Sequence, residues 1–449
     1  MIPHQIAGYS ESTTIVAEAT PQGRGGISIL RISGKDAFNI VSNLLDRDLP
    51  KPNRTTYAKL RNNNTVDSFI DDVMVSVYES PRSYTGEDVV EVSTHGNPIL
   101  VNEALEALYK EGAHPAKPGE FTLRAFLNNR MDLIQAEAVS DLIASKSKEA
   151  ARQARKQLDG GVGKTANQIS DMMMNILSSC ELELDFTEED IILLNREEKL
   201  LIVERIINDL RRMISGYSRA RNLRKGVSVA IVGSPNVGKS SLFNILANEE
   251  IAIVHHTPGT TRDVLEAVCE INGVHFTLYD TAGMRITPDE IEDEGVTRAI
   301  RKAESADMII SVSAPDIKDQ IIVNMTRKTD IIEVINKSDL ATERKEENAT
   351  YICSTDGSGI EELKDELFRR VVKDEKQGQG TISRERHYNA VQCAIKAMEE
   401  CREDIDQGQP EEIVAEQLRE AVSAMDELTG KKRLDGLIEE IFSEFCIGK

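Results

Sequence analysis

The sequence predicts a multi-domain protein: an α+β domain comes first, and a doubly wound α/β domain then interrupts a helical domain. Three observations lead to this fold class. Short apolar runs punctuated by Pro and Gly fill the first part of the chain, and apolar residues at helical spacing follow. A third region alternates strand-like and helical segments before the helical spacing returns.

The N-terminal region, residues 1–126, contains three strand-like runs: "GGISILRIS", "DDVMVSVYES" and "DVVEVSTHG". Each run alternates or is apolar throughout, and turn residues separate the runs, as is typical of α+β domains. The segment "PAKPGEF" at 115–121 has the composition of a linker.

Residues 127–222 show a helical period, with Ile134, Ala138 and Leu142 on one face and an amphipathic stretch at 196–214. The plain interpretation of both stretches is the core of a helix bundle. We expect the helical domain to resume at 376–449, after the linker "KDEKQGQG".

Residues 223–375 contain five strand-like runs, "VSVAIVG", "HFTLYD", "DMIISVS", "DIIEVIN" and "TYICS". Helical segments separate several of them, which favours a doubly wound sheet. The sequence therefore predicts one α/β unit inserted between the two helical parts.

Composition excludes several classes of protein. The chain has 449 residues, 40% of them hydrophobic, and a net charge of −22, so any RNA contact must be local. The six cysteines show no CxxC spacing, which argues against a disulfide framework or a zinc site. We find no signal-peptide pattern and no apolar run of membrane-spanning length, and we expect a cytoplasmic protein without membrane contact.

A phosphate-binding loop is the strongest motif. "GSPNVGKS", Gly233 to Ser240, follows a strand-like run and opens a helical one, which is the context that a P-loop requires. Backbone N–H groups and the helix N-terminus would hold phosphate oxygens. Lys239 would reach the β- and γ-phosphates, and Ser240 would bind Mg²⁺.

Further motifs in the expected order indicate a G domain. In "NKSD", the carboxylate of Asp339 can accept hydrogen bonds from N1–H and the N2 amino group of guanine, which adenine does not offer. "CST" at 353–355 would contact the guanine oxygen. Asp280 in "DTAG" would lie near Mg²⁺, the N–H of Gly283 would meet the γ-phosphate, and Thr261 in "GTTRD" would complete the Mg²⁺ shell. The predicted GTP-binding residues are Asn236, Val237, Gly238, Lys239, Ser240, Ser241, Thr260, Thr261, Asp280, Thr281, Ala282, Gly283, Asn336, Lys337, Asp339, Cys353, Ser354 and Thr355.

Together with these motifs, "SYTGEDVVE", "KPGEFTLRAFLNNRMDLIQAEAVSDLI" and the terminal "FCIGK" make the chain resemble the bacterial MnmE (TrmE) family of tRNA modification GTPases over its whole length. The resemblance implies a folate-binding and dimerising N-terminal domain, and a G domain within a helical one. It also implies which residue activates the water that attacks the γ-phosphate. Met284 follows "DTAG" where other GTPases carry glutamine, and a thioether cannot orient water; the family instead uses a glutamate, here Glu292.

The resemblance also implies a potassium site in place of an arginine finger, with Asn236, His255, Thr257 and Thr260 around the ion. The chain departs from the family at His255, where threonine is commoner, and carries Pro258 in the same loop.

In the N-terminal domain the resemblance assigns folate binding to Arg31, Glu91 and Arg130, together with the terminal Lys449. Position 130 is usually lysine. From the residues alone, Arg31 and Glu91 could equally form a surface ion pair. The family interpretation gives Cys446 a role in the modification, whereas the plain one makes it a small buried apolar residue. A prenylation box is rejected because Gly448 is not aliphatic and Lys449 is a poor last residue.

Family members act as homodimers and form a heterotetramer with the FAD-dependent MnmG (GidA). They modify C5 of the wobble uridine of certain tRNAs with a one-carbon unit from 5-formyl- or 5,10-methylene-tetrahydrofolate. The resemblance implies the same here. Basic clusters at 152–156, 221–225 and 431–433 could meet tRNA, although a solvated helix face is the plainer interpretation. Two alternatives are a ribosome-assembly GTPase, which would need a basic RNA-binding module, and a purely regulatory GTP switch.

Overall fold

A computed structural model describes residues 13–62, 68–185, 194–247, 265–280, 306–317, 330–341, 349–371, 382–432 and 435–449. The chain forms two compact units. Unit 1 contains Met1–Ser140, Gln157–Val203 and Ala397–Lys449, and unit 2 contains Asp141–Lys156 and Glu204–Lys396. The bounds of the four segments given above stay a prediction.

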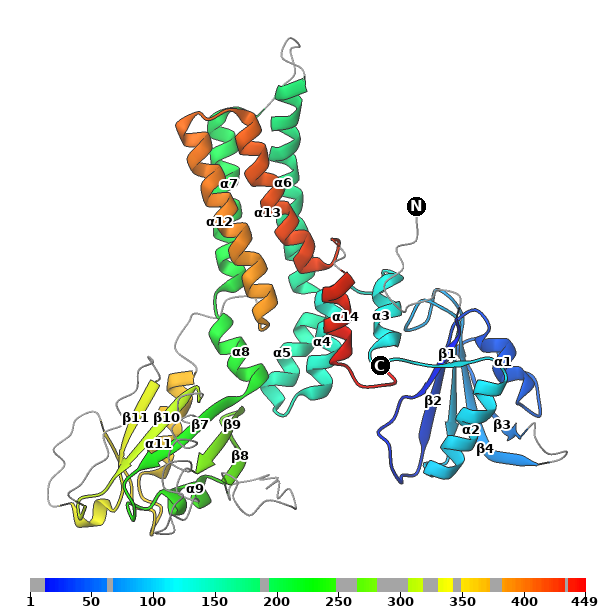
Figure 1. Ribbon diagram of the computed structural model, residues 1–449, viewed down its shortest axis with the longest axis horizontal. Helices are drawn as coiled ribbons and strands as arrows, with labels where there is room; N and C mark the ends of the chain where they lie inside the picture. Colours follow the sequence, from blue (N-terminus) through cyan, green and yellow to red (C-terminus); the bar gives the residue numbers. More distant parts are fainter. Residues whose placement is uncertain are drawn as a thin grey trace, which may run out of the picture. The chain divides into compact units, whose positions relative to one another are not determined.

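Unit 1 begins with a six-stranded sheet of order β3-β4-β5-β2-β1-β6. Two helices, α1 and α2, pack on one face of this sheet and share one apolar core with it (Figure 1). The alternating runs of the sequence supply that core, because every second residue of a strand points to the same face. The elements are β1 (Ile15–Glu18), β2 (Ser28–Ser33), α1 (Ala37–Asn43), β3 (Thr55–Arg61), β4 (Phe69–Tyr78), β5 (Val89–Thr94), α2 (Pro98–Lys110) and β6 (His114–Pro115).

Helices make up the rest of unit 1. Within it, α6 and α13 lie side by side along much of their length (Figure 1). The buried ammonium group of Lys199 links two helices of the bundle. Its Nζ lies 2.9 Å from a carboxylate oxygen of Glu183 and 2.8 Å from one of Glu411. The helices that lie wholly within unit 1 are α3 (Glu120–Leu127), α6 (Gly161–Asp185), α13 (Glu411–Thr429) and α14 (Asp435–Ser443). Three helices have residues in both units: α4 (Leu133–Ala144), α7 (Arg196–Ile214) and α12 (Glu385–Gln407).

Unit 2 is built on a second six-stranded sheet of order β12-β11-β10-β7-β9-β8, parallel except for β8. The predicted fold class is confirmed: each of the five predicted strand runs contains a strand, and β7 leads into a helix through the glycine-rich loop. The elements are α5 (Lys148–Leu158), α8 (Tyr217–Lys225), β7 (Val227–Gly233), α9 (Lys239–Ala247), β8 (Leu265–Ile271), β9 (Val274–Asp280), β10 (Met308–Ser313), β11 (Asp330–Ile335), the 3₁₀-helix η1 (Ser338–Leu340), β12 (Thr350–Tyr351) and α11 (Ile360–Val371).

The structure differs from the sequence expectation at residues 115–121. This segment is not a free linker, because β6 pairs with β1 and α3 begins at Glu120. Phe121 is fully buried, in a small apolar cluster with Ile15. The proline and glycine composition predicted a linker, because composition could not show that the neighbouring residues enter the core.

The two chain segments that flank the α/β part of unit 2 are tied together by one carboxylate. Asp141 accepts hydrogen bonds from Arg384 at 3.1 and 2.8 Å and from Arg224 at 3.5 Å. Beside this ion cluster, the rings of Tyr217 and Tyr388 stack with centroids 4.3 Å apart. The cluster therefore holds α8, which precedes β7, against the start of α12.

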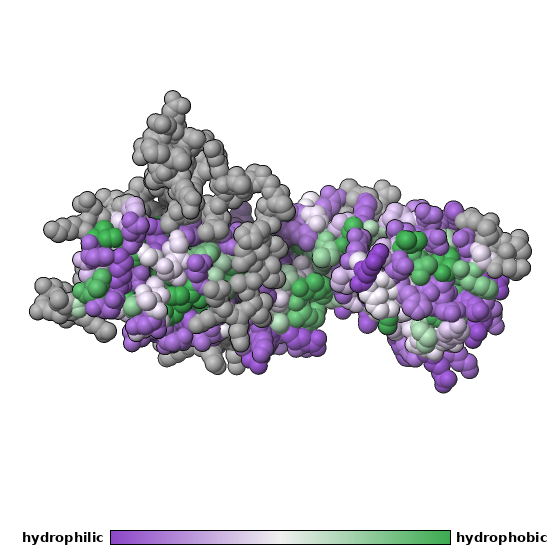
Figure 2. Space-filling model, turned by 90° about the horizontal axis from the view of Figure 1, so that it is seen from below, coloured by the Kyte–Doolittle hydropathy of each residue, from purple (hydrophilic) through white to green (hydrophobic). Residues whose placement is uncertain are grey.

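Hydrophilic residues predominate on the face drawn in Figure 2, with small apolar patches between them, in keeping with a net charge of −22. Among the helices of the described residues, none has the length and apolar character needed to cross a membrane.

Candidate functional site

The phosphate-binding loop begins where β7 ends. Gly238 has φ +95°, and a Cβ there would lie 2.1 Å from the side-chain nitrogen of Asn336, so only glycine fits. Asn236 is also left-handed, with φ 65°. The loop then opens α9 at Lys239, and its free N–H groups can bind an anion.

Lys239 is held within this loop. Its Nζ donates to the carbonyl oxygens of Gly233 at 2.9 Å and Ser234 at 2.8 Å, and the residue is only 7% exposed. Burial lowers the pKa of Lys239, and the charge of Asp280 opposes that shift. These two bonds hold the ammonium group within the phosphate-binding loop.

Two oxygen ligands suited to Mg²⁺ meet beside the lysine. Ser240 Oγ donates to Asp280 Oδ2 at 2.8 Å, and Asp280 is fully buried at the carboxyl end of β9. A hydroxyl and a carboxylate are hard oxygen donors of the kind that Mg²⁺ prefers, together with nucleotide phosphates. The pair fits the predicted Mg²⁺ site.

Asn336 connects the phosphate end with the guanine end. Its Nδ2 donates to the carbonyl of Val237 at 2.8 Å, and its Oδ1 accepts from the N–H and the hydroxyl of Ser354, both at 3.0 Å. Because Asn336 is buried, these bonds fix two loops relative to one another. Its role in the structure is to hold the site together.

The predicted guanine-reading carboxylate, Asp339, is exposed on η1, where a base can reach it. The thiol of Cys353 donates to its Oδ1 at 3.5 Å. Lys337 Nζ lies 2.6 Å from Asp316, and this hydrogen bond lowers the pKa of Asp316. Sequence reasoning missed Asp316, although its place just after β10, at the carboxyl edge of the sheet, is where α/β folds bind ligands.

Two further predicted GTP-binding residues, Ser241 and Thr355, are described and are exposed near the two ends of the site. The rest of the predicted site lies outside the described residues. The predicted residues that fall outside are His255, Thr257, Thr260, Thr261, Thr281, Ala282, Gly283 and Glu292.

A second candidate site lies in unit 1. Arg31 of β2 and Glu91 of β5 are direct partners across the sheet, and Arg31 Nε donates to Glu91 Oε1 at 2.9 Å. The guanidinium carbon of Arg31 is 5.4 Å from the ring centroid of Tyr84 and 5.8 Å from that of Phe121. These rings hold the guanidinium in place, and nothing in the sequence pointed to them.

The C-terminal residues reach this arginine. The carbonyl of Gly448 accepts from Arg31 at 3.5 Å, and the carbonyl of Cys446 accepts from the N–H of Gly119 at 3.4 Å. Burial, followed by the charge of Arg31, lowers the pKa of Lys449. The thiol-bearing Cys446 is exposed, so it is not the buried apolar residue of the plain interpretation.

Arg130 lies at a different turn of the same unit. It is exposed, and its side-chain stem lies against Gly86 in the "YTGED" segment. The structure thus brings Arg31, Glu91 and Lys449 together and places Arg130 beside Gly86.

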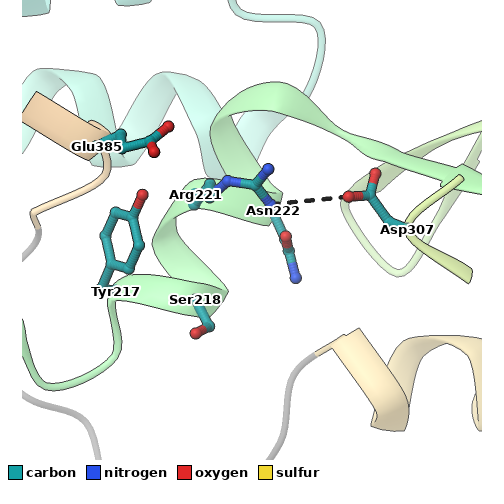
Figure 3. A pocket seen from close by; sticks show the side chains of 6 residues that line it. All are labelled: Tyr217, Ser218, Arg221, Asn222, Asp307 and Glu385. Carbon is teal, nitrogen blue, oxygen red and sulfur yellow. Dashed lines mark ion pairs between the residues drawn. The ribbon is translucent and has the colours of Figure 1, made fainter. Parts of the chain in front are cut away.

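A polar pocket of about 410 Å³ lies away from the nucleotide loop, at the amino ends of β7 and β10 (Figure 3). Arg221 points across it toward Asp307, with the two charged groups 3.8 Å apart. Asp307 also accepts from the N–H of Ser228 at 3.0 Å. The lining residues are Tyr217, Ser218, Arg221, Asn222, Asp307 and Glu385.

Comparison with known proteins gives matches over nearly the whole chain. The family model of the GTP-binding protein TrmE N-terminus matches residues 14–130, and that of the MnmE helical domain matches residues 133–446. The chain is 38% identical to the tRNA modification GTPase MnmE of Carboxydothermus hydrogenoformans, over 97% of this chain and 99% of the relative. It is 39% identical to the protein of that name from Francisella philomiragia, with the same coverage, and 37% identical to that of Cytophaga hutchinsonii, with 98% of each covered.

Proposed function

The chain belongs to the MnmE family of tRNA modification GTPases, and from this premise we propose that its GTP hydrolysis serves the modification of C5 of the wobble uridine in certain tRNAs. The observation that carries the GTPase assignment is the convergence of Lys239, Ser240 and Asp280 at the loop after β7. Deletion of the gene is expected to remove the wobble modification. A purely regulatory GTP switch would leave it intact.

The described residues divide the work of binding GTP. Lys239 neutralises charge on the β- and γ-phosphates, and the N–H groups at the start of α9 hold their oxygens. Ser240 and Asp280 would hold Mg²⁺, with Thr261 as the further predicted ligand. An ion held by these residues would neutralise negative charge on the nucleotide phosphates. Asp339 selects guanine by accepting two of its N–H donors.

Activation of water requires a group other than Met284. We assign this role to Glu292, acting through a bridging water, and we assign the charge-neutralising role of an arginine finger to K⁺. Asn236 supports the potassium assignment because it is exposed in the loop, at its left-handed turn. His255, Thr257 and Thr260 complete the proposed site.

GTP turnover in KCl and in NaCl at equal ionic strength tests both assignments. We expect potassium to stimulate turnover strongly, and Glu292→Ala to lower kcat by about 10²–10⁴-fold while GTP still binds. Glu362→Ala, an exposed carboxylate on α11, is the control and should match the wild type. Turnover that ignores the cation contradicts the potassium site, and an active Glu292→Ala enzyme contradicts the catalytic assignment.

The second candidate site, in unit 1, is proposed to bind the folate that donates the one-carbon unit. Arg31, Glu91 and Lys449 would bind the carboxylate and amide groups of 5-formyl- or 5,10-methylene-tetrahydrofolate, with Arg130 as a further ligand and the exposed thiol of Cys446 nearby. The fixed, charged Arg31 supports this assignment because guanidinium groups bind carboxylates with two hydrogen bonds. The proposed assembly is a homodimer, formed through the N-terminal domain, that joins the FAD-dependent MnmG in a heterotetramer.

Gly448→Ala tests whether the C-terminal residues complete this site. Gly448 has φ +93°, and a Cβ there would lie 2.2 Å from the carbonyl oxygen of Glu18, so alanine must displace the chain end. We expect binding of 5-formyl-tetrahydrofolate, measured by calorimetry, to weaken at least about tenfold, because Lys449 leaves Arg31. Gly436→Ala is the matched control, since a Cβ there meets nothing within 4 Å. Equal affinities for both variants would show that the chain end is not part of the site.

A further inference from the structure

The most exposed residues of helix α5 are all basic. Four of its residues are exposed, and they form the α5 basic stripe: Lys148, Arg152, Arg155 and Lys156. Their spacing of three and four residues places them along one side of the helix. Buried residues of the same helix, among them Ala150 and Ala154, occupy the opposite side.

From this pattern we infer that the α5 basic stripe binds the phosphate backbone of tRNA. The inference rests on the proposed function, which supplies the RNA substrate. In a chain of net charge −22, most of the surface repels a polyanion, so a local concentration of cations determines where RNA can approach. Glu149 pairs with Arg152 at 2.6 Å, and the four basic residues of the stripe outnumber this carboxylate, so the stripe keeps a net positive charge.

The other two basic clusters of the sequence are less suited to this role. In the cluster at 221–225, Arg221 faces Asp307 at 3.8 Å (Figure 3), and Arg224 bonds Asp141 at 3.5 Å. These guanidinium groups take part in internal ion pairs that position the α/β part of unit 2. In the cluster at 431–433, Lys432 donates to Ser423 at 2.7 Å, and position 433 lies outside the described residues.

The chemistry of the stripe favours RNA over a membrane surface. A helix that lies in a lipid interface inserts large apolar side chains beside its basic ones. On α5, which is described over its whole length, every exposed residue is charged. Electrostatic contact with a phosphate backbone needs only the charges.

The stripe lies next to the GTP-binding part of unit 2. Just before α5, the carbonyl of Lys146 accepts a hydrogen bond from the ring of His275. In the first turn of α5, Glu149 is so close to the β8–β9 turn that a Cβ on Gly273 would lie 3.0 Å from its Cγ. RNA bound on the stripe would therefore contact a helix that touches the hairpin leading into Asp280 of the Mg²⁺ site.

The test is a salt titration of tRNA binding by the full chain, with the triple variant Lys148→Gln, Arg152→Gln and Lys156→Gln. We expect the dissociation constant at 0.1 M KCl to rise about tenfold or more. The plot of the logarithm of the association constant against log[KCl] has a negative slope, and we expect its magnitude to decrease by about 2–3, since each lost phosphate contact takes about 0.7–0.9 from that magnitude. Lys148→Gln alone should decrease the magnitude of this slope by about 1. GTP turnover without RNA should stay at the wild-type value.

The matched control removes the same number of exposed charges from α7, with Arg205→Gln, Arg211→Gln and Arg212→Gln. Its affinity and salt slope should stay within about twofold of the wild type, because these residues lie outside the stripe. If the triple variant binds tRNA with the affinity and salt slope of the wild type, the inference is overturned and the proposed function still stands. The inference is also overturned if the triple variant loses only binding to phosphatidylserine vesicles. The proposed function itself fails if the wild type binds no tRNA and gene deletion leaves the wobble modification intact.

Discussion

Asp339→Asn is expected to change the base specificity of the protein from guanine to xanthine. The carboxylate of Asp339 presents two acceptors, which match N1–H and the N2 amino group of guanine. Asparagine would direct an N–H donor at that amino group, and a polar group left unpaired in a binding site costs on the order of 10⁴-fold in affinity. Xanthine carries a carbonyl oxygen at the same position and would accept the new donor.

Competition binding with GTP and XTP measures this exchange. The variant should lose GTP affinity by about 10³-fold or more and gain affinity for XTP over the wild type. Asp365→Asn, an equal charge change at an exposed position of α11, should keep the preference for GTP. If Asp339→Asn weakens the binding of GTP and XTP equally, the carboxylate does not recognise the base. Its main role would then be the hydrogen bond that it accepts from Cys353.

The second large effect concerns stability. Arg124 is fully buried, and its guanidinium donates to Glu87 at 3.0 Å, to Glu120 at 2.9 Å and to the carbonyl of Thr13 at 2.9 Å. Arg124→Met keeps the apolar stem but leaves two carboxylates close together with little access to water. Removing one partner of a buried ion cluster costs about 3–5 kcal/mol, so the N-terminal part should open far more easily.

Hydrogen–deuterium exchange read by mass spectrometry can localise this loss. Amides of β2, β5 and α3 should exchange on the order of 10²–10³-fold faster in Arg124→Met, as the lost free energy implies. Arg54→Met, at an exposed position, should change exchange little because a surface substitution costs within about 0.5 kcal/mol. Unchanged protection in Arg124→Met would mean that the two glutamates find other partners.

The sequence was sufficient for the elements that have local signals. The run 227–233 is apolar except for Ser228 and ends at Gly233, the first residue of the phosphate-loop motif, so both the strand β7 and the phosphate loop could be predicted from adjacent residues. The strand β8 was missed although a turn signal follows it. Asn272 and Gly273 both have left-handed φ, 50° and 83°, and Asn-Gly between two apolar runs is typical of a β-hairpin. The short strand β6 was hidden within the expected linker, because two residues are too few to show an alternating pattern.

The candidate sites show the same division. Sequence motifs named Lys239, Ser240 and Asp280 because phosphate chemistry restricts which residue types serve at that spacing. Only the tertiary structure decided that Arg31 lies between Glu91, two aromatic rings and the last residues of a chain that ends 418 positions later. Such contacts join residues distant in sequence, and no local pattern records them.

The basic clusters make the difference clearest. By sequence, the clusters at 152–156 and 221–225 are equivalent runs of arginine and lysine. The fold brings Asp141 and Asp307 to the second cluster and leaves the first exposed along α5. Charge is a property of the residue, and the sequence determines it; what that charge meets depends on which distant carboxylates the folded chain brings within a few ångströms, because Coulomb attraction falls with distance and is weakened by water.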